Sequence, residues 1–357
     1  MPVWLSYPSS RKDSGETAVK HCLFYLIPGN PGFIEYYATF LSALRGLLDE
    51  IEDKSSIRFT ILGRNLLGFD DGDNGDDGSG SYGLRPFDLD TQIQAAMDAI
   101  AAARIDTNHG PRHGEPFDEV FLSGHSVGSY IALEVFRRHQ ELMKQPTTSA
   151  ATGVSHLRLR AGFLLFATLT HLAKSPSGRN LERLLNTPLL GPCAPWLAER
   201  FLACWPTWAL GWIVGSVLQF PPHAASVTTR FLSSYGGVRQ ALYLGGDELV
   251  NIGEDEWADE VWELAQDSGT GRDTEKQPTP KFVILFGQND HWVANEYRDR
   301  FIARRAEHAL RDEPLHKRGR AQIVMDEKGL PHAFCLRHGE EVAEMVRSWI
   351  SDIIEDF

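Results

Sequence analysis

A serine lies between two glycines at the end of an apolar segment, in the stretch FLSGHSVGSY at residues 121–130. Ser126 is two residues from Gly124 on one side and from Gly128 on the other, and His125 fills one of the variable positions. This G-x-S-x-G spacing is typical of a sharp turn from a strand into a helix, which exposes the serine hydroxyl above a sheet. Glycines lack a Cβ, so strand and helix can pack closely around such a turn. The motif predicts a nucleophile, but only if partner residues elsewhere support it.

A serine hydroxyl is a poor nucleophile until a base takes its proton, and the base needs a carboxylate to orient it. Enzymes with a serine on such a turn carry these residues in the chain order serine, acid, histidine. Asp290 follows the apolar run KFVILFG at 281–287, and His332 lies in the loop after AQIVMD at 321–326. We therefore predict Ser126 as the nucleophile, His332 as the base and Asp290 as the acid.

Other residues compete for these roles. His291 adjoins the predicted acid in sequence, but neighbouring side chains diverge, which indicates a pocket-lining or surface residue. Asp326 and Glu327 follow a strand that comes too late in the chain for the usual acid. Asp247, followed by Glu248, remains an open alternative for the acid, because some hydrolases take it from an earlier part of the chain.

An oxyanion that forms on an ester carbonyl needs backbone N–H donors already aimed at it. One donor is expected from Val127, the residue after the nucleophile. The other is expected from the Pro- and Gly-rich loop at 28–32 that follows an early apolar run. Pro31 has no N–H, so Asn30 or Gly29 is the expected donor. The alternative is a plain turn, because proline and glycine favour turns.

Short apolar runs alternate along the chain with segments of helical spacing. Strands are expected at 22–27, 58–63, 120–123, 161–166, 281–287 and 321–326, and helices at 33–50, 88–104, 127–143, 294–310 and 337–355. This alternation predicts an α/β fold with a doubly wound, mostly parallel sheet. In such sheets the chemistry lies beyond the carboxyl ends of the strands. The predicted nucleophile, acid, base and oxyanion loop all follow strand ends.

Over a hundred residues separate the strand that ends near 167 from the strand at 281. One crossover helix needs far fewer, so residues 168–280 are expected to form a helical cap or lid. We predict a single α/β domain over residues 1–357, with its core at about 20–167 and 281–357.

The segment FLACWPTWALGWIVGSVLQF at 201–220 carries no charged residue. Its length suits a membrane span, but a span would put the two halves of the sheet on opposite sides of a membrane. Two interpretations stay open: a buried helix pair that lines an acyl pocket, and an apolar hairpin that dips into a lipid monolayer. Trp205, Trp208 and Trp212 favour the hairpin, because tryptophan concentrates at apolar–water boundaries.

The composition argues against several classes of partner. The net charge of −13 argues against nucleic acid, whose phosphates need a basic surface. It gives no support for docking on anionic lipid by charge. The four cysteines show neither metal-ligand spacing nor a disulfide framework, so free thiols in a reducing compartment are expected.

Neither a metal nor a cofactor is expected. The Asp- and Gly-rich stretch at 68–83 lacks the calcium-loop pattern of an EF-hand, and we expect a solvated loop there. The first residues lack the long apolar core of a signal peptide, so secretion is not expected.

Several segments together resemble the lipid droplet-associated hydrolase family. They are LIPGNPGFIEYYATFL, SGHSVGSYIALEV, LLFATLTHLAKSPSGRNL, LFGQNDHWVANEY and GLPHAFCLRHGEEVAEMV. The similarity runs from about residue 20 to the C-terminus, and IPGNPGFIEYY is its most specific part. The resemblance implies an α/β-hydrolase fold, association with lipid droplets and the cytosolic face of the endoplasmic reticulum, and an esterase role on sterol esters or triacylglycerol. It maps the triad onto Ser126, Asp290 and His332.

The sequence thus predicts a serine hydrolase of lipid esters at the lipid droplet surface, with an acyl-enzyme mechanism. A weakly active or non-catalytic droplet factor that acts through its apolar cap is an alternative. A soluble thioesterase or acyltransferase of the same fold is another. The expected partners are a neutral lipid ester and a droplet monolayer or reticulum membrane, and the sequence carries no signal of an oligomeric state.

Overall fold

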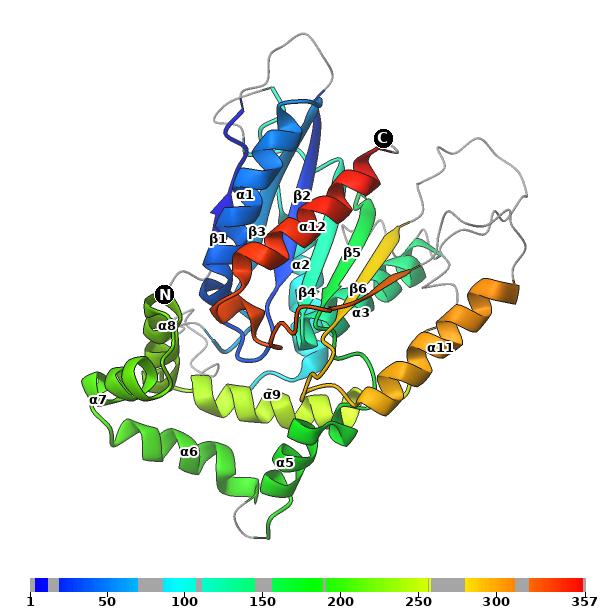
Figure 1. Cartoon of the computed structure of the whole chain (residues 1–357). Helices are drawn as coiled ribbons and strands as arrows, with labels where there is room; N and C mark the ends of the chain where they lie inside the picture. The colour runs from blue at the N-terminus through cyan, green and yellow to red at the C-terminus, as the bar shows by residue number, and fades with distance from the viewer. Residues whose placement is uncertain are drawn as a thin grey trace.

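A seven-stranded sheet forms the centre of the molecule in the computed structural model (Figure 1). The structure describes residues 4–11, 19–69, 86–106, 111–144, 156–188, 191–255, 257, 280–311 and 321–355. Most of the Asp- and Gly-rich stretch at 68–83, which was expected to be a loop, lies outside these residues.

The strands follow the order β1-β3-β2-β4-β5-β6-β7 across the sheet. Their bounds are β1 Trp4–Tyr7, β2 Lys20–Ile27, β3 Ile57–Arg64, β4 Glu119–His125, β5 Leu159–Leu165, β6 Lys281–Phe286 and β7 Gln322–Met325. Every neighbouring pair is parallel except β1 with β3. The mostly parallel α/β sheet predicted from the sequence is therefore confirmed. The edge strand β1 was not predicted, because four residues with alternating exposure give too short a signal.

Central strands of this sheet are buried on both faces. All seven residues of β4 and all seven of β5 are buried, and β2 is buried over seven of its eight residues. Parallel strands covered by helices on both sides need apolar side chains at nearly every position. This is why the sequence shows continuous apolar runs there rather than alternation.

Helices cover both faces of the sheet (Figure 1). The helices outside the cap are α1 Ala38–Glu52, α2 Leu89–Ala102, α3 Val127–Met143, α11 Asn295–Arg311 and α12 Gly339–Ile354, with short 3-10 turns at Ile34–Tyr37 and Phe334–Leu336. Helices α1 and α12 pack against each other on one face, and α2 packs with α3 on the opposite face.

Between β5 and β6 the chain forms a helical layer beyond the carboxyl ends of the strands (Figure 1). It contains α5 Pro176–Leu185, α6 Ala194–Ala203, α7 Thr207–Trp212, α8 Pro222–Ser233 and α9 Gly237–Asn251, with 3-10 turns at Leu172–Lys174 and Gly191–Cys193 and a π-helix at Ile213–Val217. We call this layer the cap. Helix α9 faces the sheet, and α6 lies on its outer side in contact with it.

The apolar segment at 201–220 forms the end of one helix, a turn and a second helix within the cap, and its insertion into lipid stays a prediction. Its first residues complete α6, the chain turns at 204–206, and α7 continues into the π-helix. Pro206 explains the position of the turn, because proline lacks the N–H and the conformational freedom that would continue α6. Among the described residues, no helix is long and apolar enough to cross a membrane.

The crossing from β4 to α3 brings two backbones unusually close. A Cβ on Gly124 would lie 2.0 Å from Gly128 O, and a Cβ on Gly128 would lie 2.3 Å from Ile27 O. No side chain fits at either position. The glycines of the motif therefore allow β2, β4 and the first turn of α3 to meet.

Replacing Gly128 by alanine is expected to lower the free energy of unfolding by about 2–3 kcal/mol, because the added Cβ must push α3 away from β2. Gly46 in α1 provides the control, since it is exposed and a Cβ there meets nothing within 4 Å. Gly46→Ala is expected to raise the free energy of unfolding by about 0.5–1 kcal/mol. Urea unfolding measures both, and a Gly128→Ala protein as stable as the wild type would contradict the close contact.

Candidate active site

Ser126, His332 and Asp290 lie in one hydrogen-bonded line. Ser126 Oγ is 2.9 Å from His332 Nε2, and His332 Nδ1 is 2.6 Å from Asp290 Oδ2. The three residues come from the β4–α3 turn, the loop after β7 and the loop after β6, as the chain order predicts. This is the geometry in which a histidine can take the proton of a serine while a carboxylate orients the ring.

Ser126 has φ of 54° and ψ of −124°, a region that side chains other than glycine rarely occupy. Its N–H donates to Leu165 O at 3.1 Å, and its carbonyl accepts from Ser129 N at 2.9 Å. These bonds to β5 and α3 hold the strained backbone in place. The strain places the hydroxyl at the tip of the turn, where His332 meets it.

Asp290 is almost fully buried and makes hydrogen bonds through both oxygens. Its Oδ1 accepts from Trp292 N at 2.8 Å, while Oδ2 meets the His332 ring. Burial acts to raise the pKa of Asp290, but the hydrogen bonds and the nearby imidazoles outweigh it and hold the pKa below its usual range. The carboxylate is therefore anionic, as a group that steadies an imidazolium must be.

Two charged side chains hold the loops that carry the acid and the base. The buried Arg298 of α11 donates to Gly287 O at 2.8 Å and to Gln288 O at 3.1 Å. Asp326 accepts from Leu330 N at 2.6 Å and from Lys328 N at 3.1 Å. Asp326, considered above as an acid, thus braces the turn that leads to the histidine.

The other candidate acids lie elsewhere. Asp247 Oδ2 accepts from Leu89 N at 2.8 Å, at the start of α2. Glu327 is exposed, and so is His291. Glu248 is buried in the wall of the cavity described below and makes a hydrogen bond with Asn30. Of these carboxylates, only Asp290 has a hydrogen bond with His332 among the described residues.

The residue before the nucleophile connects the base to the oxyanion loop. His125 Nε2 is 2.8 Å from His332 O, and His125 Nδ1 is 2.6 Å from Tyr37 Oη. Tyr37 Oη in turn accepts from Gly29 N at 2.9 Å. A carbonyl oxygen can only accept, so Nε2 carries the proton of His125 and Tyr37 donates to Nδ1.

The charge states in this chain of bonds agree with that assignment. Burial, together with the nearby His332, lowers the pKa of His125 to about 3, so its ring is neutral. Burial also raises the pKa of Tyr37 well above its ordinary value, so its hydroxyl stays protonated. Sequence reasoning missed Tyr37, because helical spacing marks it as buried without showing its partner.

The hydrogen bond of Tyr37 with Gly29 N separates the expected oxyanion donors into one that is engaged and two that are free within the described residues. The N–H of Gly29 is already used by Tyr37, so Gly29 is not available to an oxyanion. The N–H groups of Asn30 and Val127 have no hydrogen-bond partner among the described residues. Both residues adjoin the Ser126 side of the cavity, which leaves Asn30 and Val127 as the candidate pair.

A cavity of about 410 Å³ opens over the triad, between the strand ends and the cap. Ser126, His332 and the oxyanion loop form one wall, and α5, α8 and α9 contribute the opposite wall. The cap residues that line it are Leu172, Leu181, Phe220, Thr228, Phe231, Ala241, Leu242, Gly245 and Glu248. Its walls are mostly apolar, and among the described residues of the cap Glu248 is the one carboxyl in this lining. The cavity can therefore hold a hydrocarbon chain against the serine.

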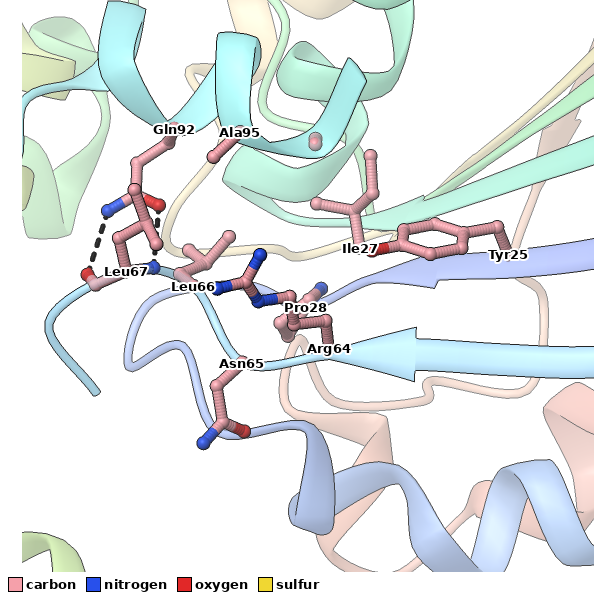
Figure 2. A pocket seen from close by; sticks show the side chains of 10 residues that line it. Tyr25, Ile27, Pro28, Arg64, Asn65, Leu66, Leu67, Gln92 and Ala95 are labelled. Carbon is pink, nitrogen blue, oxygen red and sulfur yellow. Dashed lines mark hydrogen bonds between the residues drawn. The ribbon is translucent and has the colours of Figure 1, made fainter. Parts of the chain in front are cut away.

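Two other hollows formed by the described residues contain none of the triad. Figure 2 shows a small pocket beside the ends of β2 and β3, where Gln92 makes two hydrogen bonds with the backbone of Leu67. At about 20 Å³ it holds roughly one water molecule. A polar hollow of about 720 Å³ lies beside α11, lined by His171, Lys174 and Arg300 among others. Within the described residues, no cluster of three or more His, Cys, Asp or Glu is placed to hold a metal ion.

Part of the cap carries apolar side chains on its outside. Trp205, Trp208 and Trp212 are exposed by 43%, 78% and 61%. The other exposed large apolar residues of 196–218 are Trp196, Leu197, Phe201, Val217 and Leu218. We call this set the outer cap residues. All four cysteines are free, with Cys22 and Cys335 buried and the other two exposed.

The chain is similar to known proteins over most of its length. A family model described as lipid-droplet associated hydrolase matches residues 20–335. A relative from Rattus norvegicus named lipid droplet-associated hydrolase is 28% identical over 348 residues, covering 95% of this chain and 87% of its own. The protein of that name from Homo sapiens is 25% identical over 355 residues, covering 92% and 85%.

Solved structures share the architecture. The crystal structure of DBJA matches with a TM-score of 0.50 at 14% identity, covering 99% of this chain and 96% of that chain. A likeness at this identity shows the fold alone, which is the α/β-hydrolase fold predicted above.

Removing the Tyr37 hydroxyl is expected to slow the reaction of Ser126 with a fluorophosphonate about ten- to a hundredfold. Tyr37→Phe keeps the ring contacts with His125 and Phe334 but leaves His125 Nδ1 and Gly29 N–H without a partner. The loss should fall on the maximal labelling rate and not on the probe concentration at half-saturation, because the Tyr37 hydroxyl is engaged by His125 Nδ1 and Gly29 N.

Tyr36→Phe is the control for this variant. The Tyr36 hydroxyl bonds Thr228 Oγ1 at 2.9 Å and has no bond to the triad or to the oxyanion loop. Its loss is expected to leave the maximal rate within about twofold of the wild type. Equal losses in the two variants would show that the bonds of the Tyr37 hydroxyl have no specific effect on the triad.

Proposed function

This chain belongs to the lipid droplet-associated hydrolase family, and from that premise we propose that it is a serine hydrolase of lipid esters that acts at the surface of lipid droplets. The observation that carries the proposal is the line of hydrogen bonds from Asp290 through His332 to Ser126, at the base of an apolar cavity. Such a line has one purpose in a hydrolase, which is to make the serine a nucleophile.

In the acylation half of the proposed reaction, Ser126 Oγ attacks the ester carbonyl carbon while its proton passes to His332 Nε2. The carbonyl oxygen becomes an oxyanion that accepts from the N–H groups of Asn30 and Val127. The carbon–oxygen bond to the alcohol then breaks. His332 gives the proton to the departing alkoxide, which leaves an alcohol and an acyl-enzyme.

Water completes the proposed cycle. It gives a proton to His332 and attacks the acyl carbon, and the second oxyanion uses the same two donors. Collapse of this intermediate breaks the bond to Ser126 and releases a carboxylic acid, while His332 returns the proton to Ser126 Oγ. Asp290 remains ionised throughout and stabilises the imidazolium in both halves.

The class of substrate is inferred from the cavity and from the relatives. A cavity of about 410 Å³ falls in the range of small-molecule sites, and its apolar lining favours an acyl chain. The relatives are named for lipid droplets. Together these support a neutral lipid ester, of sterol ester or triacylglycerol type, as the substrate.

Contact with the lipid surface is assigned to the outer cap residues. They lie in α6, α7, the π-helix and the residues that adjoin these elements, and α6 itself lies on the side of α9 away from the sheet (Figure 1). Tryptophan side chains favour the boundary between lipid and water, and their burial needs no basic residues. An acidic protein could thereby reach a droplet monolayer, or the surface of the endoplasmic reticulum membrane, without charge attraction.

A second candidate function rests on the same surface alone. A droplet factor with little or no turnover would need the outer cap residues but not the triad. A thioesterase or acyltransferase would use the triad on a thioester, so trials with acyl-CoA against lipid esters separate that possibility. The two experiments below test the catalytic and the surface parts independently.

A fluorophosphonate probe is expected to label the purified wild-type protein and to leave Ser126→Ala and His332→Ala unlabelled. Asp290→Asn should slow labelling by orders of magnitude, because the ring of His332 would lose the charge that stabilises its cation. Asp247→Asn is the matched control and should label at the wild-type rate, since Asp247 bonds to the backbone of α2. Absence of labelling in the wild type, with droplets present, would favour the non-catalytic factor.

Replacing Trp208 by alanine is expected to weaken binding to artificial droplets about tenfold, because this side chain is 78% exposed and would be buried in the monolayer. Trp4→Ala is the matched control, a tryptophan 42% exposed on the β1 edge of the sheet. Flotation with triacylglycerol droplets coated in phosphatidylcholine measures the bound fraction. Equal binding of the Trp208→Ala and wild-type proteins would contradict this assignment.

A further inference from the structure

Glu248 is a buried carboxyl in the catalytic cavity that none of the proposed steps uses. It lies in α9, is 5% exposed, and lines the same cavity as Ser126 and His332. A carboxyl in an apolar wall is costly to keep, since it needs partners that the wall does not supply. No cation pairs with it among the described residues, which makes its surroundings unlike those of Asp290.

The orientation of the Glu248 carboxyl follows from its contact with Asn30. Asn30 Nδ2 is 2.9 Å from Ala241 O and 3.0 Å from Glu248 Oε1. The carbonyl of Ala241 can only accept, so the atom facing it is the amide nitrogen, and the second N–H of that nitrogen points at Oε1. Oε1 therefore accepts. Any proton on the carboxyl sits on Oε2, which has no hydrogen-bond partner among the described residues.

Glu248 carries that proton at neutral pH. Burial, reinforced by the charge of the neighbouring Asp247, raises the pKa of Glu248 to about 8, although the hydrogen bond from Asn30 acts to lower it. The group is then a carboxylic acid at pH 7, and its O–H is an unused donor on a residue that lines the cavity. A neutral acid of this kind can bind an oxygen atom of a ligand.

We propose that Glu248 is a specificity-determining residue that selects esters whose alcohol carries a second oxygen, as the partial esters of glycerol and other polyols do. The inference rests on the proposed esterase function and names the class of substrate for that site. The second oxygen belongs to the alcohol, because a plain acyl chain has no oxygen beyond the scissile ester. A substrate without it would leave the Glu248 O–H buried and unpaired, and such unpaired groups are what allow a site to reject an analogue.

Two short esters test this directly. 1-Monooctanoylglycerol and propyl octanoate share the acyl chain and the alcohol carbon skeleton, and they differ only in the two hydroxyls of the glycerol. The measured quantity is the ratio of kcat/KM for the glycerol ester to that for the propyl ester. The ratio removes any effect that a variant has on both substrates alike, including a disturbed Asn30 beside the oxyanion.

Two variants of Glu248 separate recognition of the substrate's second oxygen from the hydrogen bond that Glu248 makes with Asn30. Glu248→Leu removes both polar atoms and is expected to lower the ratio about tenfold. Glu248→Gln is the matched control: its amide oxygen can accept from Asn30 and its NH2 can donate into the cavity, so the ratio is expected to stay within about twofold of the wild type. Glu248→Met replaces Glu248→Leu if the leucine variant unfolds.

The outcomes distinguish the inference from the function on which it rests. A wild-type ratio near that of the apolar variants, with Ser126 labelled by fluorophosphonate, would overturn the role of Glu248 and leave the esterase standing. A fall in the ratio for Glu248→Gln as large as the fall for Glu248→Leu would also overturn it, because the glutamine NH2 can still donate into the cavity. A wild-type protein that neither cleaves an ester nor reacts with the probe would overturn both.

Discussion

The hydrogen bond between His125 Nε2 and the main-chain carbonyl of His332 joins the nucleophile turn to the loop of the base. His332 is thereby held at two points, through its ring by Asp290 and through its backbone by His125. The two imidazole rings lie with centroids 5.1 Å apart, so a charge on one opposes a charge on the other. Since burial keeps His125 neutral, His332 can take the serine proton without meeting a second cation. The low dielectric that forbids charge on His125 also strengthens the bonds that it makes.

The cap is tied to this site by polar contacts from its inner helix. From α9, Gln240 makes two hydrogen bonds with the backbone of Phe87, Asp247 accepts from Leu89 N, and Glu248 accepts from Asn30. These contacts fix α9 to the loops that follow the strands, and α6 packs outside it. One layer of the cap therefore completes the cavity, while the other is free to present apolar side chains to a surface. A movement of α9 would disturb Asn30 and with it one of the two candidate oxyanion donors.

How much of this could be predicted from the sequence depends on the range of the interactions. Buried parallel strands such as β2 and β4 give continuous apolar runs, and the glycines of the turn reflect a local steric need, so both were predicted within a few residues. The roles of Tyr37 and Glu248 could not be predicted in this way. The sequence pattern can indicate that a residue is buried, but it does not show which distant residue it contacts. The edge strand β1 is too short to give a pattern.

The net charge and the outer cap residues together restrict the surfaces that the protein can approach. A chain with a net charge of −13 is repelled by anionic lipid, and the repulsion grows as the protein nears the surface. The outer cap residues gain free energy only on contact, because burial of apolar area has no long-range component. Within this segment Arg200 stacks over Trp196 with its guanidinium 5.6 Å from the ring centre, and Glu199 is turned inward to Gly236 N. The surface that we propose for lipid contact is thus apolar with little charge of either sign, and such a surface is better suited to a neutral monolayer than to a charged bilayer.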